Sequence, residues 1–150
     1  MLQQDLIHHF HHYLDLLQKE IEAYEKDALL WAVVEGINNS GGNLCTHLLG
    51  NLNHFIGKNM GNTGYKRDRP LEFECIDVPR EQLVKEIHET KEMIEKAILS
   101  IDDLSVDHSK QIAANPVSIQ YELIRLMIHL SYHVGQINYH RRILEGATQA

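Results

Sequence analysis

Apolar residues recur at three- and four-residue steps in four separate segments of the chain. This spacing places them on one face of an α-helix. The segments cover about residues 2–27, 43–60, 79–101 and 119–146. Four amphipathic helices of this length predict an all-α fold, a four-helix bundle in which each apolar face turns toward a shared core.

Residues that commonly start or stop helices stand at the ends of these segments. Ser40 precedes the second segment as a candidate N-cap, Gly61 follows that segment, and Pro79 takes a first-turn position in the third. The connections 61–78 and 102–117 are long for a bundle. They predict crossover loops. In the first, the alternation of Leu71, Phe73 and Cys75 allows a short extended segment, but no sheet is expected there.

Composition and charge narrow the class of protein. The length and the average hydrophobic content predict one domain, residues 1–150. A net charge of −7 argues against a basic nucleic-acid surface. The chain shows no signal peptide, the longest near-apolar run, residues 28–34, is too short to cross a bilayer, and Cys45 and Cys75 form no CxxC motif. We therefore expect a cytoplasmic protein with no nucleic-acid or membrane partner.

Histidine is the residue type in excess, with 11 of 150 positions. A helix turns about 100° per residue, so His129 and His133 lie on the same border of the apolar stripe of the fourth segment. Two imidazoles four residues apart can reach one metal ion. His47 lies on a matching border of the second segment. These three ligands would leave coordination positions open, as catalytic sites do.

Other interpretations of the histidines stay open at this point. An HxxxH spacing alone also fits partly exposed histidines of a bundle. His54 lies about 10 Å beyond His47 along the helix axis, so it could only replace His47 as a ligand. His8 and His12 share the HxxxH spacing but lie opposite their apolar stripe, which favours a solvated face. Isolated histidines are expected at the surface: His88 and His108.

The order of four motifs identifies a resemblance that covers nearly the whole chain. The chain resembles the DinB/YfiT-like superfamily of metal-binding four-helix bundles, in particular its uncharacterised DinB-like branch. The motifs are residues 39–42 (NSGG), 46–52 (THLLGNL), 67–73 (RDRPLEF) and 129–137 (HLSYHVGQI). The resemblance implies one histidine ligand from the second helix and an HxxxH pair from the fourth, which correspond to His47, His129 and His133. It also implies nickel or zinc as the ion and a homodimer.

Some members of this superfamily transfer a low-molecular-weight thiol, such as bacillithiol or mycothiol, to a small-molecule electrophile. The resemblance therefore implies a metal-dependent thiol S-transferase. Arg67, Arg69 and Glu72 are candidates for holding the thiol or substrate, and surface ion pairs that brace the loop are an equal alternative. Asn51 and Gln136 are candidates for orienting the ligand imidazoles, or for hydrogen bonds between helices.

Two other functions remain alternatives at the level of the sequence. One is a metal-dependent hydrolase, in which Glu122 or His140 would serve as general base to a metal-bound water. The other is a metal-binding protein without turnover, in which the ion stabilises the bundle by mass action.

Overall fold

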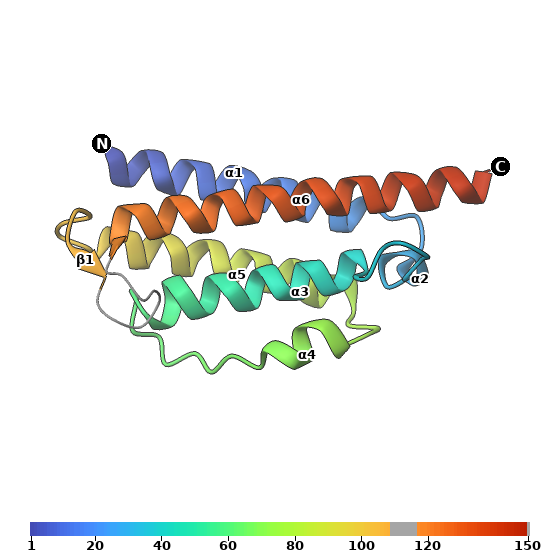
Figure 1. Ribbon diagram of the computed structural model, residues 1–150, viewed down its shortest axis with the longest axis horizontal. Coiled ribbons are helices and arrows are strands. Elements are labelled where there is room, and N and C mark those ends of the chain that lie inside the picture. The colour runs from blue at the N-terminus through green and yellow to red at the C-terminus, as the bar shows by residue number, and fades with distance from the viewer. Residues whose placement is uncertain (109–116, 150) are drawn as a thin grey trace.

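Four long helices form the body of the protein (Figure 1). They are α1 (Leu2–Ala23), α3 (Gly41–Leu52) with its continuation η1 (Asn53–Lys58), α5 (Arg80–Leu99) and α6 (Ile119–Gln149). The computed structural model describes residues 1–108 and 117–149, so residues 109–116 of the predicted connection at 102–117 lie outside the described residues. The predicted all-α bundle is confirmed.

The helices are arranged so that each packs against two neighbours. α1 packs against both α5 and α6, and α3 packs against the same two helices from the opposite side of the bundle. α1 and α6 run in one direction, and α3 and α5 run in the other (Figure 1). Because α3 and α5 are parallel, the chain between them must return along the whole bundle, which is the crossover expected for residues 61–78.

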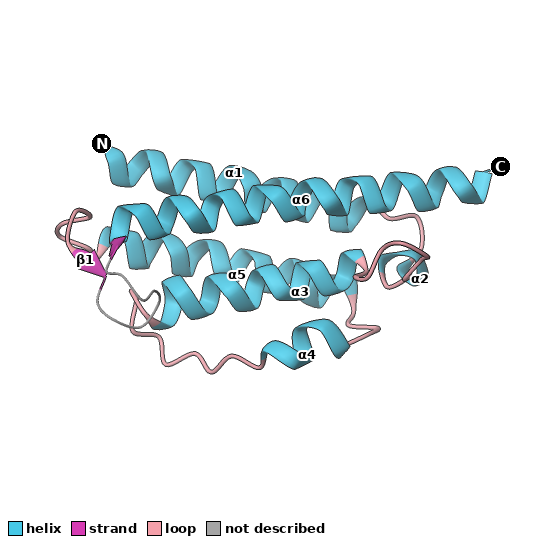
Figure 2. Ribbon diagram, in the orientation of Figure 1, coloured by secondary structure: helices cyan, strands magenta, loops and turns pink. Residues whose placement is uncertain are grey.

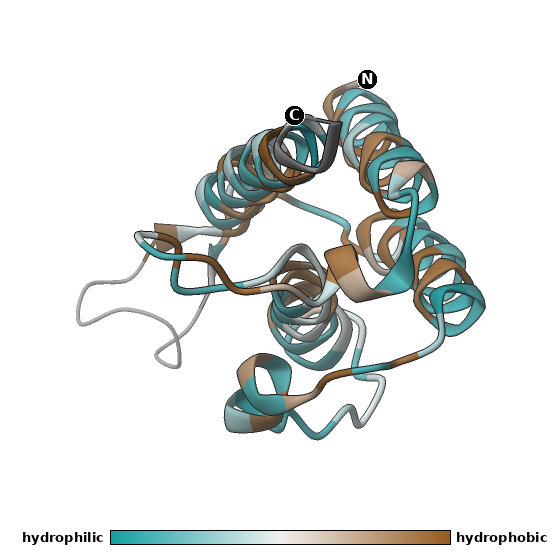
Figure 3. Cartoon of the chain, turned by 90° about the vertical axis from the view of Figure 1, so that its right-hand side faces the viewer, coloured by the Kyte–Doolittle hydropathy of each residue, from teal (hydrophilic) through white to brown (hydrophobic). Residues whose placement is uncertain are grey.

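The apolar stripes meet in one continuous core. Buried residues from all four long helices, among them Phe10, Leu48, Ile94 and Leu130, belong to a single hydrophobic cluster. Figure 3, seen along the bundle, shows brown apolar positions on the inner sides of the helices and teal polar positions outside. This is the arrangement that the predicted amphipathic faces require.

The structure corrects three of the predicted helix boundaries. The first helix ends at Ala23 rather than near residue 27, because Tyr24 leaves helical geometry with ψ at 127°, and a short α2 (Asp27–Leu30) follows. In the second segment, Asn53–Lys58 form the π-helix η1, so the helix ends two residues before the predicted end at residue 60. The fourth helix continues past Gly146 to Gln149, since this glycine does not adopt the positive φ of a helix stop.

The crossover contains a helix that periodicity did not predict (Figure 2). α4 (Arg69–Glu74) starts at Asp68, whose side chain accepts a hydrogen bond from the Leu71 N–H, and Pro70 occupies its first turn. It packs against α3. The only strands among the described residues are the short antiparallel pair β1 (Asp107–His108) and β2 (Val117–Ser118).

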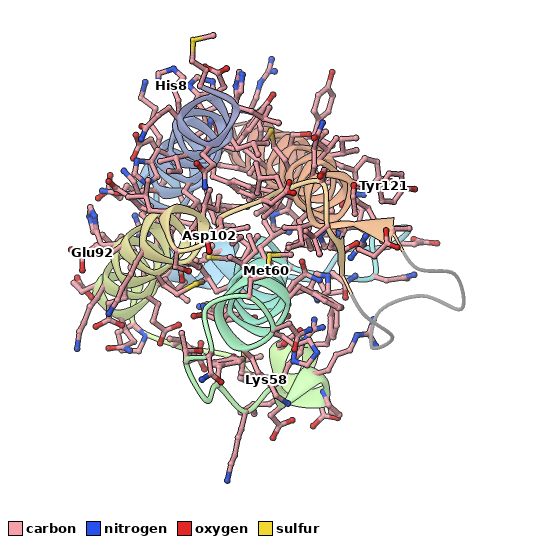
Figure 4. The ribbon with its side chains drawn as sticks, turned by 90° about the vertical axis from the view of Figure 1, so that its left-hand side faces the viewer. His8, Lys58, Met60, Glu92, Asp102 and Tyr121 are labelled. Carbon is pink, nitrogen blue, oxygen red and sulfur yellow. The ribbon has the colours of Figure 1, made fainter. Side chains whose placement is uncertain are left out.

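Two surface expectations can be compared with the structure. Figure 4 shows His8 pointing away from the bundle, and His12 is exposed too, as expected for a solvated face. His88 is exposed, whereas the side chain of His108 is not among those described. Within residues 1–108 and 117–149, none of the helices combines the length and apolar character needed to span a bilayer.

Candidate metal centre

Three imidazoles from two helices converge at the seam between α3 and α6. The Nε2 atom of His129 lies 3.3 Å from Nε2 of His47 and 3.1 Å from Nε2 of His133. One nitrogen from each of these rings lies within 4.8 Å of the other two. His47 is buried, and His129 and His133 are partly buried. The structure thus brings together the three histidines proposed from the sequence.

The outer nitrogens of two of these rings are held by polar side chains. Nδ1 of His47 lies 3.1 Å from Oε1 of Glu72, and Nδ1 of His133 lies 2.6 Å from Oε1 of Gln136. Both oxygens can only accept, so each Nδ1 carries the proton and donates it. The Nε2 atoms of both rings therefore present lone pairs toward His129, which can satisfy at most one of them with a proton.

A divalent cation fits this donor set. Zinc bound to nitrogen at about 2.0–2.1 Å with tetrahedral angles would hold the nitrogens about 3.3 Å apart. This is close to the separations of His129 Nε2 from the Nε2 atoms of His47 and His133. Imidazole nitrogens suit zinc, nickel, copper and iron, so the donor set is compatible with the expected nickel or zinc without selecting between them.

The electrostatic surroundings favour uncharged imidazoles. Burial lowers the pKa of His129 to about 4, with a further contribution from the neighbouring His133 and His47. Burial also lowers the pKa of His47, although its hydrogen bond to Glu72 acts in the opposite direction. Both rings are consequently neutral at pH 7, the form in which histidine binds a metal.

The crossover supplies the carboxylate that orients His47. Glu72 is buried in α4 and accepts two hydrogen bonds from Arg67, at 2.8 Å from Nε and 2.8 Å from Nη2. Gly50 makes room for this carboxylate, since a Cβ at position 50 would lie 2.0 Å from Oε2 of Glu72. Because an anionic acceptor on Nδ1 raises the basicity of Nε2, Glu72 prepares His47 as a ligand.

The Gly50→Ala variant is expected to fold and to bind zinc about 10- to 100-fold more weakly, the usual effect of losing a partner of a metal ligand. The three atoms nearest to the added methyl group all belong to the Glu72 side chain, so the carboxylate would be displaced from His47. A competition titration with a chromophoric chelator would measure the affinity. Gly146→Ala is the matched control, because a Cβ there meets nothing within 4 Å. Equal zinc affinities in the two variants would contradict the role of Glu72.

Hydrogen bonds from α3 side chains to the backbone of α4 hold α4 beside His47. These contacts were not anticipated from the sequence. The side chains of Asn43 and Thr46 donate hydrogen bonds to the Glu72 carbonyl oxygen, at 3.3 and 2.6 Å. The Phe73 ring stacks on His47 with 4.8 Å between ring centroids. Asp68 before Arg69-Pro70 was the sequence signal for this helix, a capping residue followed by proline.

The remaining candidates from the crossover and from α3 have different surroundings. Arg67 forms a largely buried pair with Glu72 rather than a surface one. Arg69 is exposed, with its guanidinium 5.4 Å from the Phe73 ring. Asn51 is buried, and its Oδ1 has no hydrogen-bond partner among the described residues. His54 lies in η1 outside the three-histidine group.

The two residues considered as a general base are both held by hydrogen bonds to groups outside the three imidazoles. Glu122 is buried and forms an ion pair with Arg125. His140 uses both ring nitrogens, with Tyr24 Oη at 2.7 Å and the Ala32 carbonyl oxygen at 2.9 Å. Each residue also lies two helical turns, about 10 Å, from the nearest histidine of the site on α6. The hydrolase stays a hypothesis, and at both positions the candidate base is already engaged by other groups.

Comparison with known proteins identifies the family of this chain but no individual relative. No curated protein and no solved structure matched the chain. One family model matches residues 2–149, with the description "Protein of unknown function (DUF1572)", and this family is grouped in the DinB/YfiT-like clan. With nearly every residue inside that match, the chain belongs to the DUF1572 family.

Proposed function

We propose that this protein binds one divalent metal ion, nickel or zinc, at His47, His129 and His133. The observation that carries the proposal is the convergence of the three Nε2 atoms. Those of His47 and His133 both present lone pairs, and a proton on His129 could satisfy only one of the two. Two of the rings are held by acceptors on Nδ1, the usual arrangement around metal-bound histidine.

We further propose that the centre supports the transfer of a low-molecular-weight thiol to a small electrophile. Three protein ligands leave coordination positions free, and a divalent ion deprotonates a thiol that binds to it. The clan to which the family belongs includes thiol-dependent transferases. In this chain Glu72 and Gln136 would orient two of the ligand rings, and Phe73 would shield the His47 ring from water.

A thiol panel tests the transferase directly. Zinc- or nickel-loaded protein is mixed with 1-chloro-2,4-dinitrobenzene and, in turn, bacillithiol, mycothiol or glutathione. The thiolate sulfur forms a bond to the ring carbon, chloride leaves with its bonding electron pair, and the thiol proton passes to solvent. We expect a metal-dependent rate with at least one thiol, and its loss in His47→Ala.

Two outcomes separate the parts of this proposal. Stoichiometric metal with no rate above background for any thiol would contradict the transferase and leave a metal-binding protein without turnover. In that case the metal should still raise the melting temperature, because it binds only the folded state. Absence of bound metal under all loading conditions would contradict both parts.

A further inference from the structure

A cavity lies beside the candidate metal centre, toward the C-terminal half of α6. Its volume is about 350 Å³, and it lies between α6 and the segment that leads into α3. Leu44 forms an apolar wall, and the exposed side chains of Tyr139 and Ile143 border it. Figure 3 shows the segment before α3 lying across this end of the bundle, next to α6. The volume falls in the range of small-molecule sites, about 300–1,000 Å³.

The cavity walls carry no formal charge. Of the residues that the structure describes, no aspartate, glutamate, lysine or arginine lines it. His140, its one titratable imidazole, accepts a hydrogen bond from the Tyr24 hydroxyl and donates one to the Ala32 carbonyl oxygen, so both ring nitrogens are used. Burial lowers the pKa of His140, which keeps the ring neutral. Several of the lining side chains are exposed, so a charged ligand would lose only part of its hydration here, but it would gain no counter-charge from the walls.

Gln136 connects this cavity to the metal centre. Its side chain lines the cavity, and its Oε1 accepts the hydrogen bond from Nδ1 of His133 at 2.6 Å. The amide nitrogen of the same side chain keeps two N–H donors, and no other hydrogen bond of Gln136 occurs in the described part of the chain. A ligand carbonyl in the cavity is the natural acceptor for one of these donors.

From this geometry we infer that the cavity binds an uncharged small molecule with an apolar body and a carbonyl group, held by Gln136. A ligand carbonyl that accepts from the Gln136 amide polarises it and strengthens its bond to His133. Occupation of the cavity therefore raises the metal affinity of the centre. The binding stands independently of the proposed metal function, whereas the coupling rests on it.

Three probes of one shape test the binding in metal-free protein: benzamide, benzoate and benzylamine. Titrations followed by ¹H–¹⁵N NMR should show saturable benzamide shifts at the Gln136 side-chain amide and at the Tyr139 and Ile143 backbones. The two charged probes should bind at least about tenfold more weakly, as expected for unpaired charge in an uncharged cavity. Equal binding of all three probes, or shifts confined to other parts of the protein, would overturn the inference.

A matched pair of tryptophan variants locates the binding. Ile143→Trp fills the cavity mouth and should abolish the benzamide shifts at Gln136. Ile128→Trp places the same side chain at another exposed position of α6 and should leave them unchanged. Unaltered benzamide binding in folded Ile143→Trp would exclude this cavity. If that variant does not fold, the comparison of the three probes in the natural protein still tests the inference.

Zinc titration with and without saturating benzamide tests the coupling. Benzamide should tighten zinc binding at least about fivefold, the lower range of coupling between linked sites. Gln136→Met should remove this difference. Benzamide binding without any change in zinc affinity would refute the coupling. A protein that takes up no zinc would contradict the proposed function but leave the result on the cavity in place.

Discussion

His129→Ala is expected to abolish stoichiometric metal binding. Its Nε2 lies within 3.3 Å of the Nε2 atoms of both His47 and His133. Without His129, only two of the three ligands remain. We expect the affinity for zinc to fall by more than about 100-fold, because even the loss of a hydrogen-bonding partner behind a ligand costs about 10- to 100-fold. Elemental analysis of desalted protein measures the effect.

The control for His129→Ala is the double variant His8→Ala/His12→Ala. These residues repeat the HxxxH spacing on the exposed face of α1, and they lie outside the three-histidine group. Bound metal should be unchanged in this control. If the control loses metal while His129→Ala retains one equivalent, the candidate centre has been assigned to the wrong helices.

Glu72→Ala is expected to lower the free energy of unfolding by about 3–5 kcal/mol, the range found when one partner of a buried ion pair is removed. Arg67 and Glu72 have side chains only 13% and 7% exposed, so the substitution leaves a guanidinium largely buried without its carboxylate. Urea denaturation in the presence of a chelator isolates this effect from metal binding. A loss below about 1 kcal/mol would show that the pair is effectively solvated.

The double variant Arg67→Met/Glu72→Met separates stability from function. Replacing both members of a buried pair by apolar residues is often close to neutral, so most of the lost stability should return. Zinc affinity should not return, since Nδ1 of His47 still lacks its acceptor. If stability and zinc affinity both returned in the double variant, Glu72 would affect the metal centre only by stabilising the fold.

The centre is assembled from parts of the chain that are distant in sequence. α6 supplies two imidazoles on one face, α3 supplies the third, and the crossover helix α4 supplies the carboxylate behind His47. This arrangement explains why the crossover has buried polar side chains instead of being a solvated loop. Its buried ion pair and its hydrogen bonds to α3 hold Glu72 at a defined position beside the site.

Local patterns were sufficient for some features of this protein. Apolar spacing depends only on the 3.6-residue turn of a helix, so it identified the four helices and placed His129 and His133 on one face. Helix ends were less accurate where tertiary contacts intervened. Tyr24, for example, leaves α1 and directs its hydroxyl to His140, which no periodicity could indicate.

The sequence by itself therefore determined the helices, their apolar faces and, through its family motifs, the histidines expected to converge. Only the tertiary structure decided that α4 would dock on α3, that Glu72 would orient His47, and that a cavity would form beside Gln136. The physical reason is that helical periodicity arises from neighbouring residues, whereas these features arise where the crossover and the segment before α3 pack against distant helices. Such contacts depend on register and side-chain fit, which repeat spacing does not encode.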